Sequence, residues 1–192
     1  MSEGNSKRFS PGRSFLLLLG IFLGVSFLGY AFAALNNSGA LTVTRSIAQR
    51  MGPLYDSSFR NFLKIFTNNV TVAFFMMISG LFFGLGPWLI MGFNGFVVGV
   101  VVRVVQSVRG FSMERILLGL IPHGVFEIPA LALAGTAGIV WYREIVGGDG
   151  EAGKRFQEGA VRALKLFAAS VLLLLVAAFV EAYITPRVAG LG

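Results

Sequence analysis

Long apolar runs with almost no charged residues dominate this chain and determine its fold class. Hydrophobic residues make up 55% of the 192 residues and charged residues only 13%, which is about half the charged share of a typical soluble domain. A helix of about 20 apolar residues is long enough to cross the hydrocarbon core of a bilayer. The runs are continuous, whereas a transmembrane β-barrel uses short segments of alternating polarity. The sequence therefore predicts an all-α, polytopic helical membrane protein.

Five of these runs are long enough to span a membrane, at residues 14–35, 68–84, 88–108, 122–142 and 163–183. We expect a single helical membrane domain over residues 14–192, preceded by a disordered basic segment at residues 1–13. The first run also contains Ala31-Phe32-Ala33, which resembles the A-x-A cleavage site of a signal peptide. The length of the run, about 20 residues, favours a retained spanning helix instead.

An amphipathic segment at residues 56–67 lies in the connection between the first two spans. Its basic residues Arg60 and Lys64 lie off an apolar stripe. The stripe recurs with helical spacing and consists of Phe59, Phe62, Leu63 and Phe66. A basic amphipathic helix beside a span typically lies along the membrane interface. We therefore expect an interfacial helix here, and docking of the segment against a partner protein is the alternative.

The fourth span is expected to be broken by proline. A straight helix over residues 113–141 would be about 43 Å long, whereas the hydrocarbon core is only about 30 Å thick. Pro122 and Pro129 each remove a backbone donor and disfavour helix in the preceding residue. We expect a short helix, a break just after Pro122 at His123-Gly124, and then the span itself.

Small residues spaced four apart mark helix faces that can pack closely in a membrane. The second span carries Gly80 and Gly84, and the third carries Gly95 and Gly99. These glycines are expected to let helix backbones approach rather than to bind a ligand. Asn94, a polar residue in the third span, is expected to form a hydrogen bond between helices.

Four ionisable residues are expected to meet on the side of the membrane opposite the N-terminus. The end of the third span, the start of the fourth and the end of the fifth all lie on that side, and they carry Arg103, His123, Glu127 and Glu181. His123 and Glu127 are four residues apart and therefore share one helix face. A charge at membrane depth costs at least about 2.5–3.5 kcal/mol on insertion scales, so it normally has a partner or a function.

Three interpretations of this cluster are open. The preferred one is a structural clamp, in which Arg103 pairs with a glutamate and His123 caps a broken helix end. The second is a pathway for protons or cations through the glutamates and the histidine. The third is a divalent-metal site, which is weaker because spacing alone does not show that the ligands converge. No metal and no cofactor is therefore assigned.

Several function classes lack their required residues in this chain. It has no cysteine, which excludes disulfides, thiol nucleophiles and Cys-ligated metal sites. It has no P-loop, G-x-S-x-G elbow or H-E-x-x-H motif, so we expect no enzymatic activity. A metal-dependent intramembrane hydrolase using His123 and Glu127 ranks last. The net charge of +7 comes from basic residues scattered at the ends of apolar runs, which indicates contact with anionic lipid rather than nucleic acid.

Three separated motifs match a pattern found in one family of membrane proteins. The first begins with Asn68-Asn69-Val70 and includes Gly80, Gly84 and Asn94-Gly95-x-x-x-Gly99. The second is Pro122-His123-Gly124-x-x-Glu127-x-Pro129. The third is Glu181-Ala182-Tyr183-Ile184-Thr185-Pro186. Together they resemble the integral membrane proteins related to stage II sporulation protein M, over residues 59–186. The Pro-His-Gly-x-x-Glu block is the most distinctive of the three.

The resemblance implies a multi-pass fold of about five spans. In spore formers it implies a membrane scaffold for wall-degrading proteins during engulfment. The family has no agreed catalytic residues, so the matching residues carry over as motif positions alone.

We therefore expect a non-enzymatic scaffold or anchor that forms a homo-oligomer and contacts a membrane or envelope protein. The amphipathic segment and the polar loop at residues 142–164 are its candidate docking surfaces. The alternative is a small transporter, channel or permease subunit that moves protons or cations.

The expected location is the cell membrane. Lys and Arg residues flank the spans in equal number on the two sides. Arg103 lies within a span, and without it the N-terminal side has one more Lys or Arg residue than the other side. Because basic residues are more frequent in cytoplasmic loops, this difference favours a cytoplasmic N-terminus.

Overall fold

The computed structural model describes residues 10–52 and 55–188, and these residues are almost entirely helical. The helices are α1 (Pro11–Leu35), α2 (Asn37–Met51), α3 (Ser58–Ser79), α4 (Gly86–Arg109), α5 (Met113–Gly147), α6 (Ala152–Phe179), a π-helical turn η1 (Val180–Ile184) and α7 (Thr185–Val188). Residues 1–9 of the predicted disordered segment lie outside the described residues. The last residues of that segment are helical instead, because α1 begins at Pro11.

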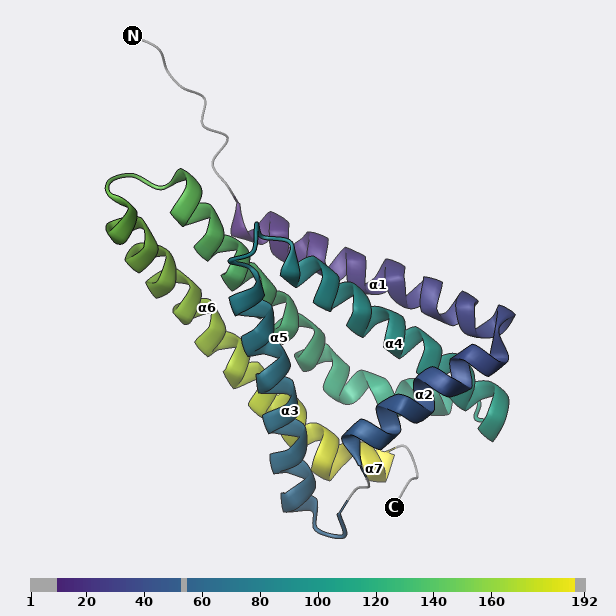
Figure 1. Cartoon of the computed structure of the whole chain (residues 1–192). Helices are drawn as coiled ribbons and strands as arrows, with labels where there is room; N and C mark the ends of the chain where they lie inside the picture. Colours follow the sequence, from purple (N-terminus) through teal and green to yellow (C-terminus); the bar gives the residue numbers. More distant parts are fainter. Residues whose placement is uncertain (1–9, 53–54, 189–192) are drawn as a thin grey trace.

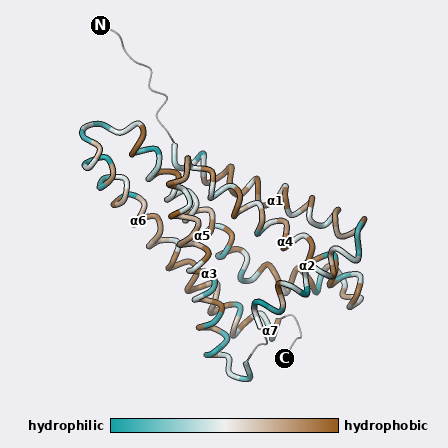
Figure 2. The backbone as a smooth tube through the Cα atoms, in the orientation of Figure 1, coloured by the Kyte–Doolittle hydropathy of each residue, from teal (hydrophilic) through white to brown (hydrophobic). Residues whose placement is uncertain are grey.

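Five helices in the described chain are long and apolar enough to cross a membrane. Their candidate spans are Pro11–Leu35, Ser58–Ser79, Gly86–Val108, Met113–Gly147 and Ala152–Val188. Apolar residues follow the middle of these helices and hydrophilic residues gather near their ends (Figure 2). Large side chains such as Phe27 and Phe82 are 72% and 69% exposed, as expected for residues that face lipid. The predicted fold class, a polytopic helical membrane protein, is therefore confirmed.

The most extensive packing joins α1 to α4 and α5 to α6, and α3 packs against both α5 and α6. The end of α3 lies near the starts of α1 and α4, and the α1–α4 pair diverges from α3 and α6 toward the opposite end (Figure 1). Helix α2 lies across that opposite end and packs against α4. A buried core of residues including Leu18, Met76 and Leu174 joins α1, α3 and α6 with α5.

Helix α2 was not predicted, although its ends carry recognisable signals. The Asn36 side chain accepts a hydrogen bond from the Gly39 N–H at 3.0 Å, which caps the first turn. Gly52 ends the helix with a φ of 65°, a conformation that glycine adopts without strain. The low hydropathy of the segment, which lies between two longer apolar runs, concealed this helix.

Two predicted boundaries differ from the structure. Residues 58–67 do not form a separate interfacial helix, because they are the first turns of the continuous helix α3. The polar segment at residues 142–164 is mostly helical, because α5 and α6 extend through it and leave only a short turn between them. Both differences arise because packing against neighbouring helices extends a helix beyond its apolar stretch.

The predicted break in the fourth span is absent. Helix α5 continues through Pro122 and Pro129 over 35 residues, a length of about 52 Å. Its course changes direction between its first turns and its later ones (Figure 1). Neighbouring helices can support the backbone groups that a proline leaves unpaired in a spanning helix, so the excess length is accommodated by a bend.

Glycines allow two pairs of helices to touch backbone to backbone. A Cβ at Gly95 or Gly99 would overlap backbone atoms of Phe22 or Ser26 on α1, and Gly29 on α1 faces the Phe96 backbone on α4 in the same way. These contacts explain the tight α1–α4 pairing.

The second pair is α3 with α5. Gly80, just after α3, lies against Gly138 of α5 so closely that a Cβ on either would overlap the other chain segment. Gly84 has a different role from the predicted one, because it lies in the turn after α3 with a φ of 70° and faces the Tyr142 ring.

Candidate functional site

His123, Glu127 and Glu181 come together in the structure as one polar group, here called the His–Glu–Glu group. Each residue offers one ligand atom, and these atoms all lie within 4.8 Å of one another. His123 and Glu127 lie one turn apart on α5, and Glu181 comes from η1 at the end of the last span. All three side chains are partly buried. The sequence placed these residues on one side of the membrane, and the fold brings them within reach of a single ligand.

A widened helical turn positions Glu181. In η1 the N–H of Thr185 donates to the carbonyl of Val180, five residues back, instead of the usual four. Pro186 follows directly, and in a regular α-helix its ring would crowd the carbonyl of residue 182. The wider turn is thus a local consequence of the proline. Single π-turns of this kind are frequent at functional sites.

Arg103 does not serve as the expected counter-ion of this group. Its guanidinium lies 6.0 Å from the centre of the Tyr30 ring on α1. The Tyr30 hydroxyl in turn donates to Gln106 Oε1 at 2.7 Å. Within residues 10–52 and 55–188, no ion pair involves Arg103, Glu127 or Glu181. The predicted clamp, in which Arg103 pairs with a glutamate, is therefore wrong.

Two buried polar atoms, one in the group and one on the helix that follows Glu181, have no hydrogen-bond partner among the described residues. His123 Nδ1 is one of them, so His123 does not cap a helix end through this nitrogen. Thr185 Oγ1 is the other, on a residue that is only 6% exposed. Buried polar atoms are normally hydrogen-bonded, and an orphaned one points to a missing ligand, ion or water.

A groove of about 790 Å³ reaches Glu181 from the end of the molecule where α2 lies. Its wall is formed by the end of α2 and the first turns of α3, and it includes the basic residues Arg50, Arg60 and Lys64. The predicted amphipathic segment thus contributes to this wall. Lys64 Nζ also donates to the Gly52 carbonyl at 3.1 Å, which ties α3 to the end of α2.

The other motif positions lie outside the group. Asn94 Nδ2 donates to the Ile90 carbonyl of its own helix at 2.8 Å, and within the described residues Asn94 forms no hydrogen bond to another helix. Gly124 has open space where a Cβ would lie, apart from ordinary contact with Ile128. Pro122 and Pro129 flank His123 and Glu127 along α5.

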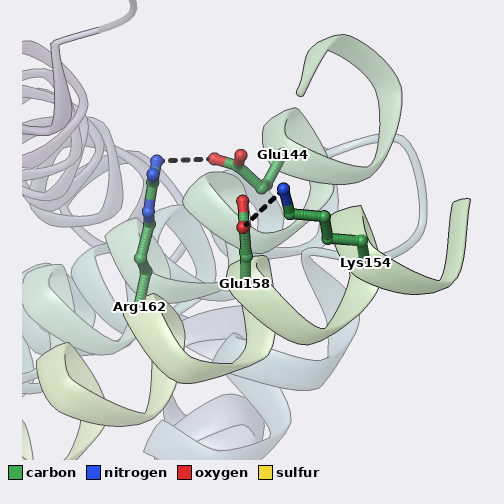
Figure 3. A network of polar contacts seen from close by, with 4 residues as sticks. All are labelled: Glu144, Lys154, Glu158 and Arg162. Atoms are coloured by element: carbon green, nitrogen blue, oxygen red, sulfur yellow. Dashed lines mark hydrogen bonds and ion pairs between the residues drawn. The ribbon is translucent and has the colours of Figure 1, made fainter. Parts of the chain in front are cut away.

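A second polar region lies at the opposite end, where α5 turns into α6. Arg162 on α6 pairs with Glu144 on α5 at 2.6 Å, and Lys154 pairs with Glu158 at 3.8 Å (Figure 3). The Arg162, Lys154 and Glu158 side chains are well exposed. The Arg162–Glu144 pair joins the two helices at a polar, solvated end, whereas the Lys154–Glu158 pair lies within α6.

Sequence comparison places this arrangement in a family. The pattern of stage II sporulation protein M matches residues 14–186, which is nearly the whole chain. The protein belongs to the stage II sporulation protein M family. This match confirms the resemblance that the motifs indicated.

Two relatives of this member of the stage II sporulation protein M family come from Methanocaldococcus jannaschii. The uncharacterized protein MJ0793 is 36% identical over 131 residues, which cover 67% of this chain and 73% of the relative. The uncharacterized protein MJ0706 is 29% identical over 135 residues, covering 66% of this chain and 56% of the relative. No solved structure matches the chain significantly. Neither relative supplies an activity, so function must be argued from the site.

Proposed function

We propose that this membrane protein transports cations across the bilayer through the His–Glu–Glu group. One observation carries the proposal: two glutamates and a histidine meet within a spanning bundle and, in the described chain, form no ion pair with a basic residue. Ionisable side chains at membrane depth are costly and mark ion pathways when no structural partner neutralises them.

The electrostatics of the group favour a cation as its ligand. Two like unit charges about 4 Å apart near a protein surface repel by roughly 4 kcal/mol. The ligand atoms of Glu127 and Glu181 lie within 4.8 Å of each other. A bound cation relieves this repulsion, whereas an anion or a neutral solute does not.

The groove favours a carrier over an open channel. It leads to Glu181 from one end of the bundle, but Arg50, Arg60 and Lys64 lie along its wall. Positive charges along the approach repel cations and disfavour rapid conduction. Release on the other side then requires a conformational change, as in transporters that bind their substrate near a helix irregularity.

Cation flux into proteoliposomes tests this proposal. Wild-type protein should raise the flux of H⁺, K⁺ or a divalent metal ion above that of protein-free liposomes, as reported by trapped fluorescent dyes. The Glu127→Gln variant should reduce that flux to the protein-free level, because it removes one carboxylate at nearly constant volume. Glu158→Gln is the matched control, since Glu158 lies at the α5–α6 turn and should leave flux unchanged.

The proposal fails on either of two results. One is a wild-type flux that equals the background for every cation. The other is a Glu127→Gln flux equal to the wild type, with both proteins folded as judged by size-exclusion chromatography.

The scaffold function is a second candidate, favoured by the hairpin formed by α5 and α6. This hairpin extends beyond the adjacent helices (Figure 1). Its outer turns carry exposed charges together with exposed apolar residues such as Val146 and Phe156, which are 60% and 47% exposed. A polar, protruding hairpin with exposed apolar residues offers a docking surface for a partner protein.

Native mass spectrometry after gentle purification from native membranes tests the scaffold candidate. A stoichiometric partner or homo-oligomer is expected, and Val146→Glu should reduce partner recovery because it places a charge on the docking surface. The control is Gln49→Glu, because Gln49 is exposed on α2 at the opposite end of the molecule and lies outside the proposed docking surface. Recovery of a monomer alone would contradict the scaffold candidate.

A further inference from the structure

We infer that His123, Glu127 and Glu181 bind one divalent transition-metal ion, such as Mn²⁺ or Zn²⁺. Binding itself is independent of transport. Only the idea that this ion is the species carried across the membrane rests on the proposed function.

The geometry of the His–Glu–Glu group is close to that of a metal site. Nitrogen and oxygen ligands lie about 2.0–2.2 Å from zinc, which places neighbouring ligand atoms about 3–4 Å apart. The three ligand atoms here already lie within 4.8 Å of one another. Glutamate side chains have three rotatable bonds, so small rotations of Glu127 and Glu181 would close this difference. Three protein ligands leave positions open for water, which also suits an ion that must be released.

The donor types select the class of ion. Imidazole suits zinc, copper, iron and nickel, whereas carboxylates suit manganese as well as magnesium and calcium, so the histidine is the donor that favours a transition metal. The chain has no cysteine to offer a soft thiolate for copper(I). The donor set is therefore suited to a borderline divalent transition metal rather than to Mg²⁺ or Ca²⁺.

The charge of the group matches a divalent ion. With both carboxylates ionised and the imidazole neutral, the three ligands carry two negative charges. A divalent ion neutralises them, whereas a monovalent ion leaves one uncompensated charge in a bundle that crosses the membrane. In the part of the chain that the structure describes, neither Glu127 nor Glu181 forms an ion pair.

Two unsatisfied polar atoms provide independent support. His123 Nδ1 is buried without a hydrogen-bond partner, and one ring nitrogen of His123 lies within 4.8 Å of an oxygen of each carboxylate. Thr185 Oγ1 is also buried without a partner. Thr185 follows Glu181 by four residues, which places it near the same side of the helix, and its helix α7 packs against α5. A metal-bound water or a ligating carboxylate would satisfy such a hydroxyl, as outer partners do in known metal sites.

Metal binding by the full-length protein in detergent tests the inference. Protein stripped with a chelator and dialysed against Mn²⁺ or Zn²⁺ should retain one ion per chain by elemental analysis, and the ion should raise the midpoint of thermal unfolding. Metal at 100 times its Kd would stabilise the folded state by about 2.7 kcal/mol. Mg²⁺ at the same concentration should give no shift.

Matched variants distinguish this site from adventitious binding. Removing a single outer partner of a metal site typically weakens affinity by about 10–100-fold, so His123→Gln, Glu127→Gln and Glu181→Gln should each weaken binding by at least about 100-fold. Glu158→Gln should bind like the wild type. Three separate ligand variants keep the test valid if one of them fails to fold. The electron paramagnetic resonance spectrum of bound Mn²⁺ should change from the wild-type form in any variant that retains some metal.

The outcomes separate this inference from the proposed function. One metal ion per chain, lost in the ligand variants, supports the metal site even if no flux is found, and in that case the transport function fails. Flux of protons or K⁺ without stoichiometric metal overturns the metal site and leaves cation transport standing. Metal retained equally by all three ligand variants also overturns the site.

Discussion

Replacing Gly99 by alanine is expected to destabilise the protein by about 3 kcal/mol, at the upper end of typical overpacking costs. A Cβ at this position would overlap the Ser26 carbonyl and lie 2.7 Å from the Tyr30 nitrogen, both on the α1 backbone. A flexible side chain could rotate away, but a helix backbone cannot. The added methyl group must therefore push α1 away from α4 and open the contacts at Gly95 and Gly29 as well.

Thermal unfolding in detergent, followed by the fluorescence of Trp88 and Trp141, measures this effect. Gly92→Ala is the matched control, because Gly92 lies on the same helix and faces the same partner. Its Cβ would meet Ile21 and Val25 only at 3.8 and 3.9 Å, which is ordinary contact. Alanine is the better helix former by about 0.5–1 kcal/mol, so Gly92→Ala should be neutral or slightly stabilising. Equal midpoints for the two variants would show that α1 and α4 do not touch as described.

These glycines illustrate how far sequence spacing predicts packing. The four-residue spacing of Gly95 and Gly99 correctly indicated a close helix contact. The same spacing failed for Gly84, which lies in a turn with a φ of 70°. Spacing shows which residues share a helix face, but it does not show whether a neighbouring helix covers that face.

The His–Glu–Glu group shows a similar limit. Counting spans placed its members and Arg103 on one side of the membrane, and three of the four residues do meet. Arg103 lies on α4, which pairs with α1 and diverges from α3 and α6 toward the end where α2 lies (Figure 1). The order of spans gives the side of the membrane on which a residue lies. It does not give the neighbouring helix that the residue faces.

Helix boundaries depended on tertiary packing that hydropathy does not record. Residues 58–67 are amphipathic by pattern, yet they continue into α3 because Phe62 and Ile65 pack against the end of the last helix. The prolines of α5 suggested a break, but the packed bundle keeps that helix continuous. Helix propensity and hydropathy depend only on the residues of a segment itself. They therefore do not include the packing of neighbouring helices, which stabilises these segments as continuous helices.

Replacing Gly138 by alanine is expected to cost about 3 kcal/mol as well, because it separates α3 from α5. A Cβ here would overlap the Met77 carbonyl and lie 3.0 Å from the Met76 carbonyl and 3.1 Å from Gly80 Cα. Every one of these atoms belongs to backbone. Helix α5 also carries His123 and Glu127, so the displacement should weaken any metal binding by the His–Glu–Glu group together with stability.

Gly135→Ala separates this mechanism from a general intolerance of bulk in the core. Gly135 is equally buried on the same helix, three residues away. Its Cβ would meet Leu18 Cδ1 at 2.9 Å and Met76 Cε at 3.0 Å, both at the ends of flexible side chains that can rotate, and Pro87 Cβ at 3.2 Å, where a shift of a few tenths of an ångström relieves the contact. Gly135→Ala should therefore unfold within a few degrees of the wild type in the same detergent assay. If Gly135→Ala were as damaging as Gly138→Ala, side-chain crowding rather than backbone contact would limit the approach of α3 to α5.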